Sequence, residues 1–132
     1  MADRFDYLVL TPSDFEQSLA FYRDILGWHE LESLEGRSAA HYVILSGGGV
    51  RIMLRKVSAN GSARAMQSNA PSRTPSTPTL HLDIHDVHNR FGRLSAGLHV
   101  VAPPGLDEFG RLHFVLRDPD GNLLVFNELR QR

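Results

Sequence analysis

Histidines are the side chains of this sequence that are best suited to chemistry, since imidazole serves as a metal ligand, a general base or a pH-sensitive group. The chain holds 7 histidines. His81 and Asp83 stand two residues apart in TLHLDI, and His113 lies in GRLHFVL. Side chains two apart on a strand share a face, so Asp83 could orient or charge the His81 ring. His81 is therefore the candidate general base, and the alternative is a half-buried structural histidine.

Two similar runs of elements position these residues. The first run predicts a strand, a helix and three further strands over residues 5–11, 15–26, 28–34, 40–46 and 50–57. The second run predicts the same order over residues 79–84, 87–97, 98–104, 110–116 and 122–129. An aspartate stands at the same offset before each helix, Asp14 and Asp86, and a glycine ends each one, Gly27 and Gly97. Ser13 is the other candidate cap of the first helix.

This repeat predicts an α+β fold built from two βαβββ modules. We expect the modules, residues 1–57 and 78–132, to form one compact domain. Their strands should make a curved mixed sheet around a cleft, with the helices on the convex side. Residues 58–77 are rich in Ser, Ala, Asn and Pro, which predicts a flexible linker or loop.

Alternation along the strands divides the sheet residues into two sets. The apolar set should pack against the helices and contains Leu8, Leu10, Ile52, Leu54, Leu80, Leu82, Ile84, Phe114, Leu116, Leu124 and Phe126. The mixed set contains Tyr7, Val9, Thr11, Arg51, Met53, Arg55, Thr79, His81, Asp83, Arg111, His113, Val115, Val125 and Asn127. The candidate ligand-binding set within it consists of Tyr7, Arg51, Met53, Thr79, His81, Asp83, Arg111, His113 and Val125. Apolar and aromatic walls with a few donors are typical of small-molecule sites. Arg51 and Arg111 could bind a carboxylate or phosphate there, or could be solvated surface arginines.

Two motifs are shared with a known family, FDYLVLTPSDFEQSLAFYRDILGW at the front and GRLHFVLRDPDGNLLVFNE at the back. On these motifs the chain resembles the vicinal oxygen chelate superfamily, the group of glyoxalases, bleomycin resistance proteins and extradiol dioxygenases. The resemblance covers nearly the whole chain, and it implies paired modules and a homodimer. Because this fold hosts isomerases, dioxygenases, thiol transferases and drug-binding proteins, the resemblance does not decide the activity.

The resemblance also locates the positions that hold a metal in the metal-using members. Carried over residue by residue, these four positions are Tyr7, Met53, Thr79 and Val125, with a possible slip of one residue at Met53. None of them is a suitable ligand for a hard or borderline divalent ion, which prefers imidazole or carboxylate. We therefore expect no cofactor and assign no metal ligand. A count shifted by two residues would put His81 in the place of Thr79.

The leading hypothesis is a metal-independent small-molecule-binding protein, similar to the bleomycin resistance proteins, that holds a hydrophobic or aromatic ligand in the cleft. The alternative is an enzyme of the superfamily, either a glyoxalase-type lyase or isomerase or a dioxygenase. Such an enzyme would use a non-standard metal site or His81 as general base. A third hypothesis is association with another protein through residues 58–77.

Composition and sequence pattern argue against several other classes of protein. The 132 residues carry 14 basic and 15 acidic side chains, so no basic surplus favours nucleic acid. No apolar run approaches the roughly 20 residues of a membrane helix, and the N-terminus lacks the pattern of a secretion signal. The absence of cysteine excludes disulfides, thiolate metal sites and a cysteine nucleophile. A cytoplasmic location is the expectation.

Overall fold

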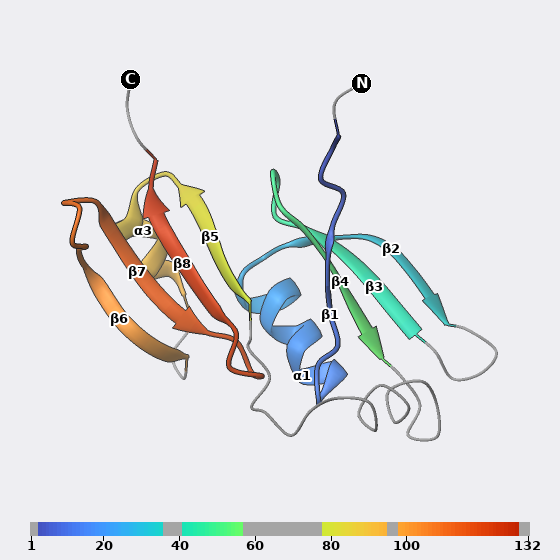
Figure 1. Ribbon diagram of the computed structural model, residues 1–132. Helices are drawn as coiled ribbons and strands as arrows, with labels where there is room; N and C mark the ends of the chain where they lie inside the picture. Colours follow the sequence, from blue (N-terminus) through green and yellow to red (C-terminus); the bar gives the residue numbers. More distant parts are fainter. Residues whose placement is uncertain (1–2, 36–40, 57–77, 95–97, 130–132) are drawn as a thin grey trace, which may run out of the picture. The chain divides into compact units, whose positions relative to one another are not determined.

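The computed structural model describes residues 3–35, 41–56, 78–94 and 98–129. The chain divides into two compact units, Met1–Pro75 and Ser76–Arg132. Within these described residues, each unit has a four-stranded mixed sheet and one helical segment (Figure 1). The predicted linker, residues 58–77, lies outside the described residues.

The first unit has the strand order β1-β4-β3-β2. Its elements are β1 (Leu8–Leu10), α1 (Phe15–Ala20), η1 (Phe21–Ile25), β2 (His29–Glu35), β3 (His41–Ser46) and β4 (Arg51–Lys56). Strand β1 runs parallel to β4, and the β2–β3 and β3–β4 pairs are antiparallel. This is the predicted βαβββ order, with a first strand shorter than residues 5–11.

The second unit has the strand order β5-β8-β7-β6. Its elements are β5 (Thr79–Ile84), α3 (Val87–Arg93), β6 (His99–Leu106), β7 (Leu112–Arg117) and β8 (Leu123–Glu128). Strand β5 runs parallel to β8, and the other two pairs are antiparallel. The two units therefore repeat one topology, which confirms the predicted α+β fold of two modules.

The strand register repeats as well as the topology. Leu8 pairs with Ile52 in the first sheet, and Leu80 pairs with Leu124 in the second, a shift of 72 residues in both strands (from 8 to 80 and from 52 to 124). The same shift relates Met53, which pairs with Val9, to Val125, which pairs with His81. Met53 and Val125 are thus equivalent positions of the two sheets.

Aspartates begin both helices, as predicted. The Asp14 carboxylate accepts a hydrogen bond from the Gln17 backbone N–H at 3.0 Å, and Asp86 accepts one from Asn89 at 3.1 Å. These bonds satisfy donors that have no partner within the helix. Of the two candidate caps of the first helix, Asp14 is the one that fills the position.

The helix ends differ from each other. After α1 the chain widens into the π-helical turn η1, in which the Leu26 N–H donates to the Phe21 carbonyl at 3.0 Å, and Gly27 follows with φ +76°. This agrees with the predicted end at Gly27. Helix α3 was expected to reach residue 97 but ends at Arg93, because Leu94 turns to extended backbone with ψ 142°.

Strand β6 is longer than the predicted strand and turn over residues 98–104. Its pairing with β7 shifts between Val100 and Ala102 and again between Ala102 and Gly105. The strand contains two prolines, which lack the N–H for a continuous ladder. Because β6 is an edge strand, its prolines and bulges are tolerated. Strand β7, which carries His113, lies inside the sheet between β8 and β6.

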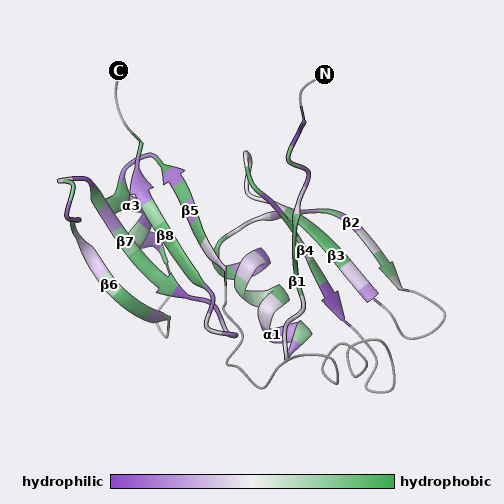
Figure 2. Cartoon of the chain, in the orientation of Figure 1, coloured by the Kyte–Doolittle hydropathy of each residue, from purple (hydrophilic) through white to green (hydrophobic). Residues whose placement is uncertain are grey.

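The cores confirm most of the predicted apolar set, whereas Leu8, Leu80, Leu82 and Ile84 are half-buried. In the first unit the buried sheet residues Ile52 and Leu54 are 0% exposed, and α1 contacts β4. In the second unit the Phe114 and Phe126 rings stack with centroids 4.6 Å apart, and Phe91 of α3 meets Phe114 at 5.1 Å. Figure 2 shows hydrophobic residues running along β7 and β8. The opposite face of each sheet, called here the helix-free face, presents the mixed set.

Two aspartate turns close the hairpins of the second unit. In the β7–β8 turn the Asp118 carboxylate accepts from the backbone N–H groups of Asp120 and Asn122 at 2.9 and 2.8 Å. In the β6–β7 turn Asp107 accepts in the same way from Phe109 and Arg111, both at 2.9 Å. A glycine with positive φ stands three residues after each aspartate. These turns fix the start of β7 and the start of β8.

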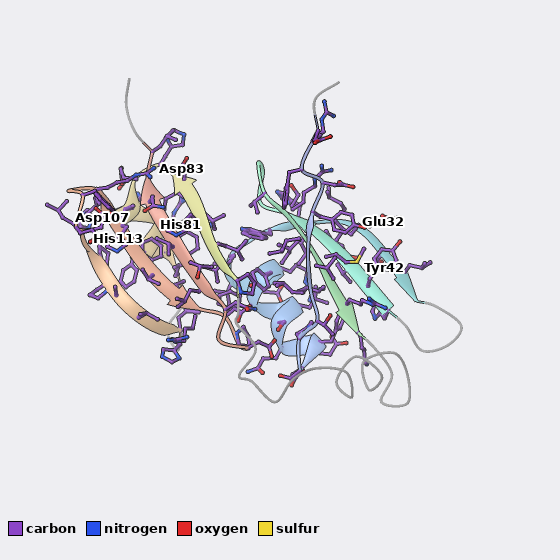
Figure 3. The ribbon with its side chains drawn as sticks, in the orientation of Figure 1. Glu32, Tyr42, His81, Asp83, Asp107 and His113 are labelled. Atoms are coloured by element: carbon purple, nitrogen blue, oxygen red, sulfur yellow. The ribbon has the colours of Figure 1, made fainter. Side chains whose placement is uncertain are left out.

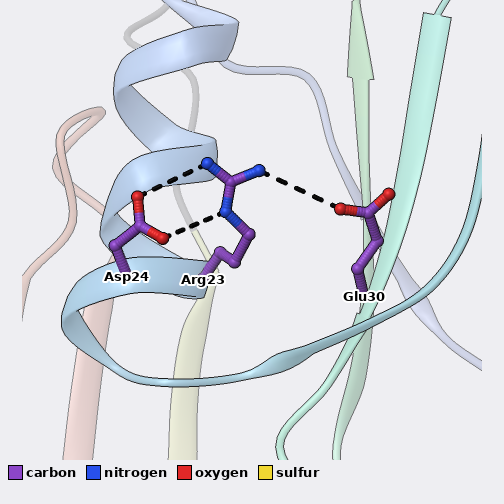
Figure 4. Close-up of polar contacts among 3 residues, drawn as sticks. All are labelled: Arg23, Asp24 and Glu30. Carbon is purple, nitrogen blue, oxygen red and sulfur yellow. Dashed lines mark hydrogen bonds and ion pairs between the residues drawn. The ribbon is translucent and has the colours of Figure 1, made fainter.

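An arginine joins the first helical segment to the strand that follows it. Arg23 forms a salt bridge with Asp24 at 3.0 Å and reaches Glu30 at the start of β2 at 3.9 Å (Figure 4). The hydrogen bond and charge of Asp24 raise the pKa of the Arg23 guanidinium. The guanidinium is exposed, so these salt bridges link the helical segment to β2 but contribute little to the free energy of unfolding.

Candidate functional site

A pocket of about 410 Å³ lies in the first unit. Its lining consists of Tyr7, Val9, Leu34, His41, Tyr42, Met53 and Arg55. Most of these residues share the helix-free face, because they alternate with the buried residues of their strands. The pocket therefore uses side chains that the hydrophobic core does not.

Cross-strand pairs build the pocket wall. Val9 of β1 stands opposite Met53 of β4, and Arg55 of β4 stands opposite Tyr42 of β3. Tyr42 in turn stands opposite Leu34 of β2. Side chains of directly opposed residues lie within contact distance. These pairs form a continuous surface from β1 to β2 that is apolar and aromatic except for one guanidinium.

His41, the first residue of β3, also lines the pocket. Its ring centroid lies 4.8 Å from that of Phe15, the first residue of α1. The contact with a buried phenylalanine holds the imidazole in place at the pocket rim. His41 thus has a packing role as well as a place in the lining.

Tyr42 is the most perturbed acid of the pocket. Burial raises the pKa of the Tyr42 phenol, and the neighbouring Glu32 carboxylate raises it further (Figure 3). The phenol therefore keeps its proton at neutral pH. It can act as a hydrogen-bond donor, and it does not present a negative oxygen to a ligand.

The arginines of the helix-free faces differ in their partners. Arg51 pairs with Asp6 at 3.1 Å, and Arg111 pairs with Asp83 at 2.6 Å. Arg111 also donates through Nε to the Glu128 carbonyl at 3.0 Å. In the part of the chain that the structure describes, no ion pair joins Arg55 to an acidic side chain. Figure 2 shows the end of β4, where Arg55 lies, as hydrophilic.

Sequence reasoning found part of this pocket. Tyr7 and Met53 of the candidate ligand-binding set line it, whereas Arg51 is outside the lining. Val9 and Arg55 belong to the mixed set but were not candidates, and Leu34, His41 and Tyr42 were missed. Strand alternation applied to the second and third strands could have indicated Tyr42, because it faces Arg55 across the β3–β4 pair.

The other candidate residues gather in the second unit. Thr79, His81 and Asp83 alternate along β5, and Val125 of β8 is the partner of His81. His113 of β7 stands opposite Asn127, which in turn is the partner of Asp83. The structure thus brings these residues onto one helix-free face.

Their hydrogen bonds differ from the expected pairing. Asp83 does not orient His81, since its carboxylate lies on Arg111 at 2.6 Å. His81 instead meets the buried side chain of Asn127, with Nδ1 and Nδ2 3.4 Å apart. His113 Nδ1 lies 3.1 Å from the Gly105 carbonyl oxygen. Neither imidazole is paired with a carboxylate through a hydrogen bond among the described residues.

Asp107 supplies negative charge beside this face (Figure 3). The backbone N–H of Arg111 lowers the pKa of the Asp107 carboxyl below its ordinary value of 3.8, and the His113 and Arg111 charges act in the same direction. The carboxylate is therefore ionised throughout the neutral range. Because the Asp107 carboxylate accepts two backbone hydrogen bonds in the turn before β7, its role is to stabilise that turn.

Two of the side chains expected at the family's metal positions, those of Met53 and Val125, do not suit a divalent ion. Val125 is 9% exposed and presents only hydrocarbon, and Met53 presents a thioether. Within residues 3–35, 41–56, 78–94 and 98–129, no three His, Asp or Glu side chains come together as a metal site.

Among the helices that the structure describes, none has the length and apolar character needed to cross a membrane.

Comparisons with known proteins agree with this architecture. The virulence protein STM3117 of Salmonella typhimurium is 28% identical over 134 residues, which is 96% of this chain and 84% of that protein. Its crystal structure has a TM-score of 0.63 at 25% identity and covers 98% of this chain and 99% of that one.

Two further crystal structures share the fold. A glyoxalase/bleomycin resistance protein/dioxygenase family enzyme from Burkholderia phytofirmans PsJN has a TM-score of 0.70 at 21% identity, covering 94% of this chain and 97% of that one. TioX from Micromonospora sp. ML1 has a TM-score of 0.69 at 18% identity, covering 96% and 100%. At these identities the likeness concerns the fold alone.

The sequence model of one family spans almost the whole chain, from residue 4 to residue 126. The two βαβββ modules with their repeated register are the architecture expected of that family. The chain belongs to the Glyoxalase/Bleomycin resistance protein/Dioxygenase superfamily.

Proposed function

We propose that the protein binds a small molecule with an aromatic or apolar body in the pocket of the first unit, without a metal ion. The observation that carries this proposal is the pocket of about 410 Å³ lined by two tyrosines, three aliphatic or thioether side chains, one histidine and one arginine. Ligand pockets of roughly this size and composition are common in proteins, with volumes of about 300–1,000 Å³.

The chemistry of the lining supports binding more than turnover. The phenol of Tyr42 stays protonated, and His41 packs on Phe15. The resemblance assigns Met53 and Val125 to positions at which metal-using members carry ligands, and neither side chain suits a hard or borderline divalent ion. The alternative is an enzyme of the superfamily with a non-standard metal site or with His81 as general base.

A matched pair of variants tests the binding site. Val9 lines the pocket and is 44% exposed, and Val101 on β6 is 45% exposed. We expect at least one of three aromatic probes, indole, naphthalene-2-carboxylate or quinoline, to bind the wild-type protein in calorimetric titration. Val9→Arg should weaken that binding about tenfold, a loss of about 1.4 kcal/mol, and Val101→Arg should leave it unchanged. Equal affinities in both variants would place the ligand elsewhere.

Metal titration separates the proposal from its alternative. A divalent ion bound only by the folded protein raises the unfolding temperature, because its binding free energy adds to stability. We expect Zn²⁺, Ni²⁺, Mn²⁺ and Fe²⁺ to leave the unfolding temperature unchanged. A clear rise with any of them, abolished by His81→Ala, would favour the enzyme with a non-standard metal site.

We also propose that the protein is a cytoplasmic homodimer. Exposed apolar side chains on β6 and its turn support association, namely Val100, Leu106 and Phe109. Patches of this kind mark protein contacts in many soluble proteins. Sedimentation equilibrium tests the proposal, and a monomer at micromolar concentration would contradict it.

A further inference from the structure

The corner between β5 and α3 holds the one residue other than glycine that has positive φ in the part of the chain that the structure describes. Asp86 has φ 54° and ψ 81°, and its carboxylate caps α3 through the Asn89 N–H. Helix α3 begins at the next residue, Val87, which is 0% exposed. Left-handed backbone is uncommon for a residue with a side chain, and it persists only where the surrounding structure holds it.

The side chain of Glu128, at the end of the neighbouring strand β8, holds this corner. One carboxylate oxygen accepts a hydrogen bond from the Asp86 N–H at 3.1 Å, and the other accepts one from the Val87 N–H at 2.7 Å. Hydrogen bonds to a carboxylate are stronger than those between neutral groups. The Glu128 carboxylate therefore clamps two consecutive backbone donors and offsets the cost of the left-handed residue between β5 and α3.

The backbone around Glu128 extends this connection to two further segments. The Leu129 N–H donates to the Ile84 carbonyl at 2.8 Å, which closes the end of the β5–β8 pair. The Glu128 carbonyl accepts from Nε of Arg111, just before β7, at 3.0 Å. The Arg111 guanidinium also binds Asp83 of β5 at 2.6 Å, and Figure 3 labels Asp83 near the end of that strand. One residue thus joins the end of β5, the start of α3 and the start of β7.

The first unit builds the same corner without the carboxylate. The shift of 72 residues that relates the two sheets carries Asp14 to Asp86 and Lys56 to Glu128. An ammonium group can only donate, so Lys56 cannot bind backbone N–H groups. Asp14 has extended backbone, with φ −124° and ψ 98°, and it still caps its helix. The β1–β4 register also ends two residues earlier than the β5–β8 register. The chain therefore shows two conformations of one corner, left-handed with the carboxylate and extended without it.

We propose that the β5–α3 corner is a conformational switch with two states, and that the Glu128 carboxylate controls it. In the closed state Asp86 is left-handed and β5 is paired to its end. In the open state Asp86 takes the extended backbone seen at Asp14, and the end of β5 separates from β8. Asp83 then leaves Arg111, so opening changes the charge of the helix-free face and frees a guanidinium.

The position of β5 makes this opening local. Strand β5 is at the edge of its sheet, so within the described sheet its backbone pairs with β8 alone. Phe114 and Phe126, which form the stacked core pair, belong to β7 and β8 and are not touched when the end of β5 moves. Local openings of such segments require less free energy than global unfolding.

Native-state hydrogen exchange of the full-length protein, followed by NMR, tests the switch. Glu128→Gln keeps the size of the side chain but replaces one oxygen by an amide nitrogen that can only donate. Glu108→Gln, at an exposed position of the β6–β7 turn, removes the same charge and is the matched control. The Leu129 amide and Nε–H of Arg111 are the reporters, because neither donates to the Glu128 carboxylate.

We expect Glu128→Gln to accelerate exchange about tenfold at both reporters, which corresponds to about 1.4 kcal/mol. The central amides of β7 and β8 should exchange at the wild-type rate, and Glu108→Gln should change none of these rates. The proposal is overturned if acceleration is confined to the two amides that the carboxylate binds, because Glu128 is then an ordinary helix cap. It is overturned equally if the whole sheet accelerates together or if no amide accelerates.

A second pair of variants tests the left-handed backbone itself. Threonine and asparagine both provide a side-chain oxygen that can cap a helix, but asparagine tolerates positive φ far better than the β-branched threonine. Asp86→Thr should therefore accelerate exchange of the Leu129 amide about tenfold, whereas Asp86→Asn should not. Asp14→Thr, at the extended counterpart, should leave that amide unchanged. Equal rates in the two Asp86 variants would show that the corner stores no strain and would refute the switch. No ligand takes part, so these results are independent of the pocket of the first unit.

Discussion

Three consecutive glycines between β3 and β4 should respond differently to the same substitution by alanine. At Gly47 an added Cβ would lie 2.6 Å from Cε2 and 2.7 Å from Nε1 of Trp28. These distances are far below van der Waals contact, so the ring or the turn must move. Trp28 is 5% exposed and its ring lies 5.3 Å from that of Tyr22, so a displaced ring disturbs the core.

The expected magnitudes follow from these environments. Overpacking a well-packed core costs about 1–3 kcal/mol, and we expect Gly47→Ala to lower the free energy of unfolding by about 2 kcal/mol. Gly48 has φ +99° and open space around it, so alanine there costs about 1–2 kcal/mol from backbone strain alone. Gly49 has neither constraint. Alanine at Gly49 should stabilise the protein by about 0.4–1 kcal/mol, since it reduces the entropy of the unfolded chain.

Urea unfolding followed by tryptophan fluorescence measures all three variants with an internal reporter. Trp28 is the only tryptophan of the chain. We expect Gly47→Ala to lower the urea midpoint and also to shift the emission of the native protein, because the ring itself is displaced. Gly48→Ala should lower the midpoint without that shift. The steric explanation is wrong if Gly47→Ala matches Gly49→Ala in midpoint and leaves the native emission unchanged.

The two aspartate turns give further predictions. Asp118→Ala removes three hydrogen bonds to a 5% exposed carboxylate, two from backbone N–H groups and one from the Asn122 amide at 2.7 Å. We expect a loss of about 3 kcal/mol or more in urea unfolding, and a loss below about 1 kcal/mol would contradict the structure. Because the folded-state pKa of Asp107 is lowered, its contribution is present above the ordinary value of 3.8 and is lost as the pH falls through the folded pKa. The difference in unfolding temperature between wild type and Asp107→Asn should therefore be largest near neutral pH and vanish in strong acid, and a difference that grows toward acid would refute this.

The fold was predictable because local signals repeat along the chain. Asp14 and Asp86 mark the starts of the two helices. Alternation places Leu80 and Leu82 on the core side of β5, and in the same way it places Leu8 and Leu10 on the core side of β1. The end of α3 was not predictable in the same way. Residues after Arg93 carry no proline or strong breaker before Gly97, and the turn to extended backbone at Leu94 depends on tertiary context.

The candidate site was predictable only where its strands are regular. Tyr7 and Met53 follow from counting, because β1 and β4 pair without interruption. Leu34 does not, since a register shift between Glu30 and Glu32 changes which residues of β2 face the pocket. A shift of one residue exchanges the two faces of a strand, and the sequence gives no sign of it. The Asp83–Arg111 pair joins residues far apart in sequence, and alternation alone cannot choose it over Asp83–His81.

The two sheets show which positions of a repeated module are free to change. Core-facing positions remain apolar in both copies, as in Ile52 and Leu124, because each helix must be covered by hydrocarbon. Equivalent positions on the helix-free faces have diverged, from Val9 in one copy to His81 in the other, because the fold places no such demand on them. One copy therefore presents an apolar, aromatic pocket and the other a polar face with two histidines. The repeat explains the architecture, and the differences between its copies carry the information about function.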